Sequence, residues 1–162
     1  MKEKGWYNGY PWSEREAKFE VLTRRIASGE QSPAAGPCDL CGDDEVPVEY
    51  HDEDYSPPYL WDFPALLALC RNCHRNKLHM RFRWPAMWRA FLAHVRRGGY
   101  AREFKDPKVK KEVALHLAAI ARGETSTLSQ LHPYRKVVGE EWFANLRMNI
   151  ESLSDPNARP RP

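Results

Sequence analysis

Two pairs of cysteines constrain the fold of this 162-residue chain more than any other feature. One Cys-x2-Cys pair is Cys38 and Cys41, and the second is Cys70 and Cys73. Each pair presents two thiolates from one tight turn, and two pairs complete the tetrahedral shell of one zinc ion, with Zn–S distances of about 2.3 Å. Such a shell leaves no open position, so we expect a structural zinc that takes no part in chemistry.

The composition indicates a folded protein outside the membrane. The apolar fraction of 42% is typical of a folded domain. No apolar run reaches the roughly 18 residues of a transmembrane helix, and the first 20 residues contain no apolar stretch of a secretory signal. We therefore expect a cytoplasmic protein without a membrane partner, where paired cysteines favour a metal over disulfides.

Turn signals and hydrophobic periodicity divide the chain into four parts. We predict an N-terminal helical arm and linker over residues 1–36 and a cysteine-bearing core over residues 37–84. A helical C-terminal region over residues 85–153 and a disordered tail over residues 154–162 follow.

Local patterns predict the individual elements. Ser13 is expected to cap the first helix, in which Phe19, Leu22 and Ile26 recur at helical spacing. A short strand is expected around residues 46–50, where apolar residues alternate. The helices are expected at residues 13–28, 85–97, 106–122 and about 140–153.

The charges are divided along the chain although the formal net charge is only +3. The segment between Cys38 and Cys70 contains many acidic residues and no lysine or arginine, whereas residues 71–111 are strongly basic and also aromatic. That mixture is typical of segments that contact phosphates and stack on bases. We therefore expect nucleic-acid contacts from Arg71, Arg75, Lys77, Arg81 and Arg83.

Polar residues that suit a metal site stand inside the zinc frame. His51, Asp52 and Asp54 follow the predicted strand, and His74 comes directly after the fourth cysteine. Because both groups are attached to one zinc site, they can lie within a few ångströms of each other. A divalent-metal site requires this proximity.

This combination resembles the HNH nucleases of the ββα-metal group. The resemblance covers residues 38 to about 80 and rests on YHDEDYSPP, on CRNCH and on the LH that ends the same stretch. It implies an α+β fold, with a small ββα-metal core held by the four-cysteine zinc site, an N-terminal helix and about three C-terminal helices. It also implies an endonuclease or nickase that hydrolyses DNA phosphodiester bonds.

The resemblance further implies roles for single residues. In that family a strand histidine acts as general base on water, and a strand residue and helix histidines hold one divalent ion. We expect His51 as the base, and Asp52 or Asp54 with His74 and His79 as ligands of Mg²⁺ or another divalent ion. In the alternative register His51 is a ligand and Asp52 is the base.

Two features depart from the family pattern. His74 and His79 are five residues apart, about 140° around a regular helix, so His79 joins the site only if the helix is distorted or ends. Ala65 stands where the family has its asparagine. A catalytically inactive zinc-ribbon module that binds DNA or RNA is therefore the alternative, and a homodimer is a further possibility.

Overall fold

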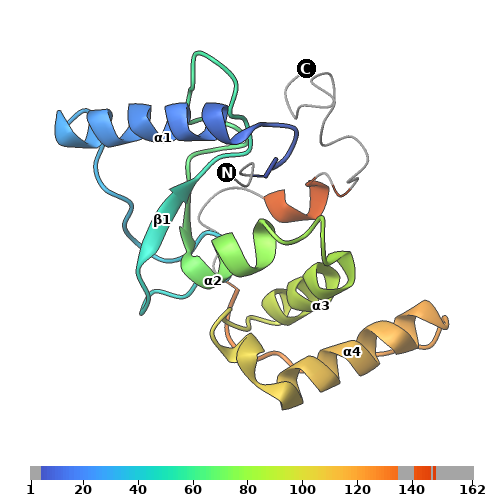
Figure 1. The fold of residues 1–162 in the computed structure, drawn as a ribbon. Helices are drawn as coiled ribbons and strands as arrows, with labels where there is room; N and C mark the ends of the chain where they lie inside the picture. Colours follow the sequence, from blue (N-terminus) through green and yellow to red (C-terminus); the bar gives the residue numbers. More distant parts are fainter. Residues whose placement is uncertain (1–4, 135–140, 147, 149–162) are drawn as a thin grey trace.

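The computed structural model describes residues 5–134, 141–146 and 148 (Figure 1). It combines helices with one small antiparallel sheet of two strands, as the predicted mixed class requires. None of the described helices is long and apolar enough to cross a membrane. The elements in chain order are α1 (Trp12–Ala27), β1 (Val48–His51), β2 (Leu67–Cys70), α2 (Arg71–Cys73), the π-helix η1 (His74–Leu78), α3 (Pro85–Arg96), the 3-10 helix η2 (Glu103–Lys105), α4 (Pro107–Ala121) and the 3-10 helix η3 (Trp142–Asn145).

The sheet places the ends of its strands beside the two candidate metal sites. Val48 pairs with Cys70 at one end, and His51 pairs with Leu67 at the other. Every residue of β2 is buried, whereas only His51 is buried in β1. The run Leu-Ala-Leu-Cys is apolar throughout, as is typical of a buried strand, and it forms β2, which leads directly into a helix.

Helix α1 covers the upper end of the sheet and the loop after β1 (Figure 1). It begins one residue earlier than expected, after Pro11 and without a side-chain cap, so the predicted capping role of Ser13 is wrong. Its buried face is also unexpected, because Phe19 is 63% exposed whereas Lys18 is fully buried. Lys18 thus lies on the buried face of α1, where the apolar pattern predicts Phe19.

The apolar core lies between the cysteines and α3. Trp88 and Phe91 of α3 are buried against Leu69 of β2 and Leu78 of η1. Helix α4 then packs on α3, on the side away from the sheet (Figure 1). The helices predicted over residues 85–97 and 106–122 are confirmed, and Asp106 Oδ1 caps α4 by accepting from Lys108 N–H at 2.8 Å.

Two predictions concern the C-terminal residues. Of the helix expected over residues 140–153, the structure describes only the short η3 with its flanking residues, and the rest lies outside the described residues. The tail over residues 154–162 lies outside them too. Phe143 of η3 is buried in the same core as α3.

Candidate metal centres

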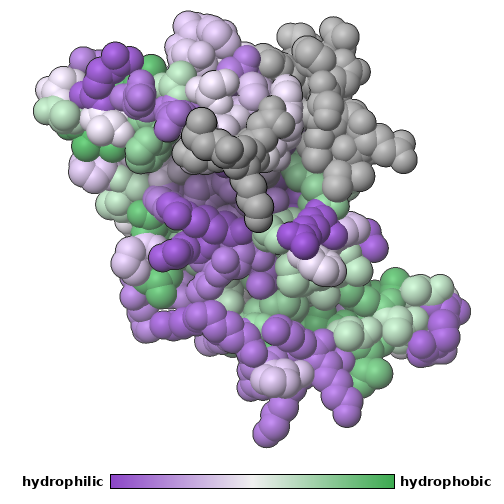
Figure 2. Space-filling model, in the orientation of Figure 1, coloured by the Kyte–Doolittle hydropathy of each residue, from purple (hydrophilic) through white to green (hydrophobic). Residues whose placement is uncertain are grey.

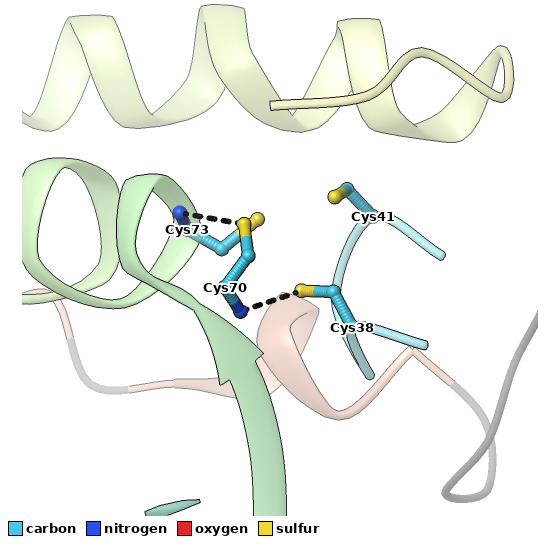
Figure 3. Close-up of side chains that lie close together, drawn as sticks. All are labelled: Cys38, Cys41, Cys70 and Cys73. Carbon is cyan, nitrogen blue, oxygen red and sulfur yellow. Dashed lines mark hydrogen bonds between the residues drawn. The ribbon is translucent and has the colours of Figure 1, made fainter. Parts of the chain in front are cut away.

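Four cysteines form one buried group, the cysteine cluster (Figure 3). It consists of Cys38, Cys41, Cys70 and Cys73, whose sulfur atoms all lie within 4.8 Å of one another. None of them forms a disulfide. The first pair lies in the loop before β1, and the second pair joins the end of β2 to α2. The cluster could therefore hold a metal such as zinc, as the spacing predicts.

Backbone contacts fix the first cysteine turn to the sheet. Asp39 N–H donates to the Ala68 carbonyl at 2.8 Å, and Ala68 N–H donates to Asp39 Oδ2 at 2.6 Å. Gly42 N–H donates to the Cys38 carbonyl at 2.7 Å. Gly42 has a φ of +74°, a conformation that glycine adopts without strain. These contacts fix the position of the turn relative to β2.

Contacts inside the cysteine cluster favour ionisation at some sulfurs and oppose it at others. Cys70 N–H donates to Cys38 Sγ at 3.2 Å, and Cys73 N–H donates to Cys70 Sγ at 3.4 Å (Figure 3). Hydrogen bonding with the Cys38 thiol lowers the pKa of Cys70 and raises the pKa of Cys41. Four thiolates this close repel one another, so all four ionise together only around a cation.

Three histidines form a second group of possible ligands, the histidine cluster. It consists of His51, His74 and His79, and one ring nitrogen of each lies within 4.8 Å of the others. His51 ends β1, His74 begins η1 directly after Cys73, and His79 follows η1. The structure thus brings together the three histidines that the sequence analysis selected.

A π-helical turn places His74 and His79 on one face. His79 N–H donates to the His74 carbonyl at 3.0 Å, which is the i to i+5 hydrogen bond of a π-helix. Residues five apart therefore lie above one another, and the two ring centroids are 4.3 Å apart. The distortion that His79 needs in order to join the site is present.

The outer nitrogens of two histidines face carboxylates. His51 Nε2 lies 2.7 Å from Glu53 Oε1, and His74 Nδ1 lies 2.8 Å from Glu49 Oε1. Carboxylates only accept hydrogen bonds, so these ring nitrogens carry the hydrogens. Histidines that bind metals in proteins are commonly oriented by such outer carboxylates.

The other ring nitrogens of His51 and His74, the inner ones, then point their lone pairs at each other. His51 Nδ1 lies 2.9 Å from His74 Nε2. In neutral rings both of these atoms are acceptors, and two acceptors at this distance repel unless a proton or a metal cation lies between them. His79 adds a third acceptor or donor, because its buried Nε2 has no partner among the described residues. The contact between these two atoms is therefore favourable when a proton or a metal cation lies between them.

Burial keeps two of these rings neutral. Burial lowers the pKa of His51 to about 4. Burial likewise lowers the pKa of His79 well below its ordinary value. Neutral imidazole is the form that binds metals. The Tyr7 ring, 4.1 Å from the ring of His79, closes this side of the cluster.

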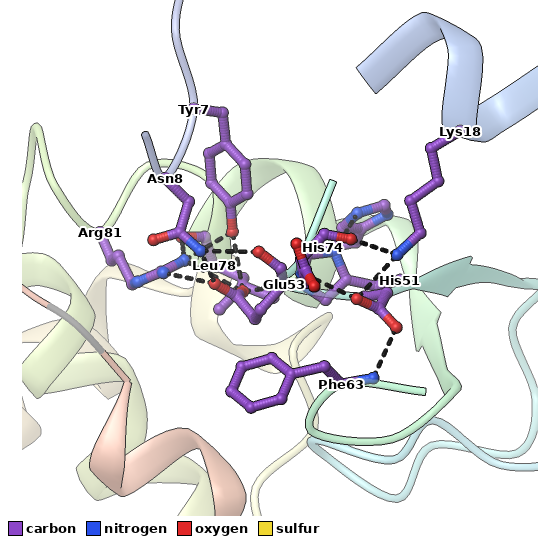
Figure 4. A network of polar contacts seen from close by, with 11 residues as sticks. Tyr7, Asn8, Lys18, His51, Glu53, Phe63, His74, Leu78 and Arg81 are labelled. Atoms are coloured by element: carbon purple, nitrogen blue, oxygen red, sulfur yellow. Dashed lines mark hydrogen bonds and ion pairs between the residues drawn. The ribbon is translucent and has the colours of Figure 1, made fainter. Parts of the chain in front are cut away.

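Glu53 joins the histidine cluster to a buried polar network (Figure 4). It accepts from the Tyr7 hydroxyl at 2.9 Å, from Asn8 Nδ2 at 2.7 Å and from Arg81 Nη2 at 2.8 Å. Although burial alone raises the pKa of Glu53, the Arg81 charge and the His51 hydrogen bond lower it to about 2. Glu53 therefore stays ionised and holds the ring of His51 in one orientation.

The sequence analysis missed Glu53, Glu49 and the N-terminal contacts. Tyr7 and Tyr10 form an isolated β-bridge around Asn8 and Gly9, both of which have positive φ values. Asn-Gly between two aromatic residues is a strong signal for such a turn. That signal predicts the turn but not its insertion beside residue 53, which depends on tertiary packing.

The structure does not bring Asp52 and Asp54, which were predicted to take part in metal binding or catalysis, into the histidine cluster. Asp52 Oδ1 pairs with Lys18 Nζ at 2.8 Å, and its Oδ2 accepts from Phe63 N–H at 2.8 Å. Asp54 Oδ1 accepts from the Tyr10 hydroxyl at 2.6 Å, and the Asp54 carbonyl accepts from Lys18. These carboxylates attach α1 and the N-terminal turn to the loop after β1.

The predicted nucleic-acid contacts separate into three kinds. Arg81 is fully buried against Glu53, so its guanidinium is not available to a nucleic acid. Arg75 is more than half exposed but pairs with Glu49 at 2.6 Å. Lys77 is half-buried, and Arg71 and Arg83 are exposed.

Comparisons with models of protein families, with curated proteins and with solved structures found no match to this chain.

Proposed function

We propose that the protein is a metal-dependent endonuclease or nickase that hydrolyses DNA phosphodiester bonds, with a zinc ion in the cysteine cluster. The observation that carries the proposal is the histidine cluster itself. Two of its rings are oriented by carboxylates, its inner nitrogens face one another, and it lies beside a frame of four cysteines. A cluster of this kind has no purpose in a merely structural zinc module.

The surrounding backbone supports the resemblance to HNH nucleases. β1 and β2 are antiparallel, and β2 continues into α2 and η1 without a loop. His51 at the end of β1 therefore faces His74 at the start of η1. We infer that this unit is a ββα-metal core. We further infer that the missing family asparagine at Ala65 is replaced by the contact of Asp52 with Phe63, between the strands, and by that of Asp39 with Ala68 of β2.

The ligand set favours a transition metal over Mg²⁺. Three imidazoles without a carboxylate suit ions such as Zn²⁺ or Ni²⁺, whereas Mg²⁺ prefers oxygen ligands. A divalent ion bound there would polarise a phosphate oxygen and lower the pKa of bound water. His74 and His79 would hold it, and Glu49 would orient His74.

His51 could act as a metal ligand or as the general base. Its geometry favours the role of ligand. Glu53 holds the Nε2 hydrogen, so the Nδ1 lone pair points at His74 Nε2. A lone pair in that position is directed at the place of the ion. As a general base acting from the same atom, His51 would have to accept the proton of water bound next to His74.

A plasmid-nicking assay tests the proposal. Wild-type protein with Zn²⁺, Ni²⁺, Mn²⁺ or Mg²⁺ is expected to convert supercoiled plasmid into nicked or linear forms. The variants His51→Ala and His74→Ala are expected to lose this activity. His116→Ala is the matched control, because His116 is half-buried and hydrogen-bonds Ser126 far from the cluster.

The outcomes separate the two candidate functions. Absence of nicking with every ion, together with retained DNA binding, would establish the inactive zinc-ribbon module instead. Equal nicking by the wild type and both cluster variants would show that the active site lies elsewhere.

A further inference from the structure

The arginines of the basic segment are mostly neutralised by ion pairs. Each pair joins a guanidinium to a carboxylate from another part of the chain, which reduces its attraction for an outside anion. These pairs are Arg75 with Glu49, Arg81 with Glu53, Arg96 with Glu141, Arg97 with Glu112, and Arg102 with Asp43 and Glu45.

The lysines of the same segment form no such pair, and neither do Arg71, Arg83 and Arg89 among the described residues. Within the described part of the chain, Lys77, Lys105 and Lys110 make no ion pair with a carboxylate. Lys105 and Lys110 are exposed, and Lys77 is half-buried. We call these three residues the lysine surface. Its charge remains available to a partner.

The fold holds the lysine surface together across a long stretch of sequence. Lys77 Nζ lies 5.4 Å from the ring centroid of Phe104 and 5.8 Å from that of Phe91. Phe104 is buried in η2, and Lys105 is the next residue. Lys110 follows in α4, which packs on η2. Segments about thirty residues apart thus bring their ammonium groups to one side of the molecule.

Keeping these charges together is unfavourable for the protein alone. The ammonium groups of the three lysines repel one another when they are held together, as like charges do. Lys110 also lies near the N-terminus of α4, where the helix dipole disfavours cations. An anionic partner would remove both penalties.

We propose that the lysine surface binds the phosphate backbone of the nucleic acid whose cleavage is proposed above. Lys77 belongs to η1, the helix that begins with His74, so phosphates bound by the lysines would continue from the histidine cluster toward α4. Figure 2 shows hydrophilic side chains in a band over this face, from the region of α2 to the start of α4. Lysine ammonium groups act as point charges on phosphates, so this contact is independent of base sequence.

The salt dependence of binding tests the inference. The probe is a short fluorescein-labelled DNA duplex, titrated by anisotropy over a series of salt concentrations without added divalent ion. Each lost phosphate contact makes the slope of log K against log salt concentration shallower by about 0.9. Lys105→Ala and Lys110→Ala are therefore each expected to change the slope by about 0.9, and the double variant by about 1.8.

Arg24→Ala is the matched control, because it removes one exposed positive charge from α1 without breaking an ion pair among the described residues. It is expected to leave the slope unchanged. An unchanged slope in the double variant would overturn the inference, and so would an equal change in Arg24→Ala. Circular dichroism spectra and metal content equal to those of the wild type show that the lysine variants are folded.

The inference and the nuclease proposal fail separately. Plasmid nicking with an unchanged slope in the double variant would overturn only the lysine surface. A changed slope without any nicking would support the lysine surface and overturn the nuclease.

Discussion

The two candidate metal centres lie close together in the sequence but are built in different ways. The cysteine cluster is assembled from two short turns, each of which supplies both of its ligands. The histidine cluster takes single residues from the end of β1, the start of η1 and the residue after η1. It is then held by Glu53, by the N-terminal turn around Asn8 and by Arg81. Local turns can be recognised from spacing, whereas a site held by distant contacts depends on the whole fold.

Removal of the metal from the cysteine cluster is expected to have the largest effect. Structural zinc contributes on the order of 10 kcal/mol to the folding of small zinc domains. Cys70→Ser, or prolonged treatment with a strong chelator, should therefore abolish the cooperative thermal unfolding transition measured by circular dichroism. His79→Ala should keep that transition and one bound metal per chain, and loss of the transition in this variant would show that the two centres are not separate.

Breaking the buried pair beneath the histidine cluster is expected to have the next largest effect. Arg81→Met leaves the Glu53 carboxylate buried without its cation, and such changes cost about 3–5 kcal/mol. Urea denaturation should show this loss in the free energy of unfolding. Arg83→Met is the control, because Arg83 is exposed, and its effect should stay within about 0.5 kcal/mol.

Helix α1 offers a second test of a buried charge pair, formed by Lys18 and the residue after His51. Lys18→Ala leaves Asp52 buried and unpaired, so it is expected to destabilise the protein by about 3 kcal/mol. Phe19→Ala, the neighbouring change, should alter stability by no more than about 0.5 kcal/mol, because the ring is exposed. A larger effect for Phe19 than for Lys18 would contradict the packing of α1 described above.

The last expected effect is the pH dependence contributed by His51. Its pKa of about 4 in the folded chain lies below the ordinary histidine value, so the unfolded chain binds the proton first. Its contribution to stability is complete above about pH 6.5 and is lost as the pH falls from about 6.5 to 4. Glu53, with a pKa of about 2, adds a separate loss between about pH 4.5 and 2. Urea titrations of metal-free protein should show that His51→Gln reduces the pH dependence in the upper window, to which His79 also contributes, and that a loss of stability below about pH 4.5 persists.

The sequence predicts the parts of this molecule that depend on local chemistry. The cysteine pairs, the strand that ends at His51, α3 and the Asp106 cap of α4 all follow from spacing or from single turns. The partners of buried charges do not, because Lys18 and Glu53 find theirs on segments far away in the chain. The acidic run at residues 52–54 is therefore predicted to bind a metal, whereas in the structure Asp52 contacts Lys18 and Asp54 contacts Tyr10.

The π turn at His74 has a consequence for everything that follows it. A π turn behaves as one extra residue absorbed into a helix, and it shifts the rotational phase of the next side chains by about 100°. That shift directs Leu78 into the apolar core and Arg81 toward Glu53, in addition to aligning the two histidines. Deletion of Asn76, an exposed residue inside the turn, would give the His-x3-His spacing of a regular helix. The π turn thus keeps both histidines on one face, although the helix holds one more residue between them than the His-x3-His spacing does.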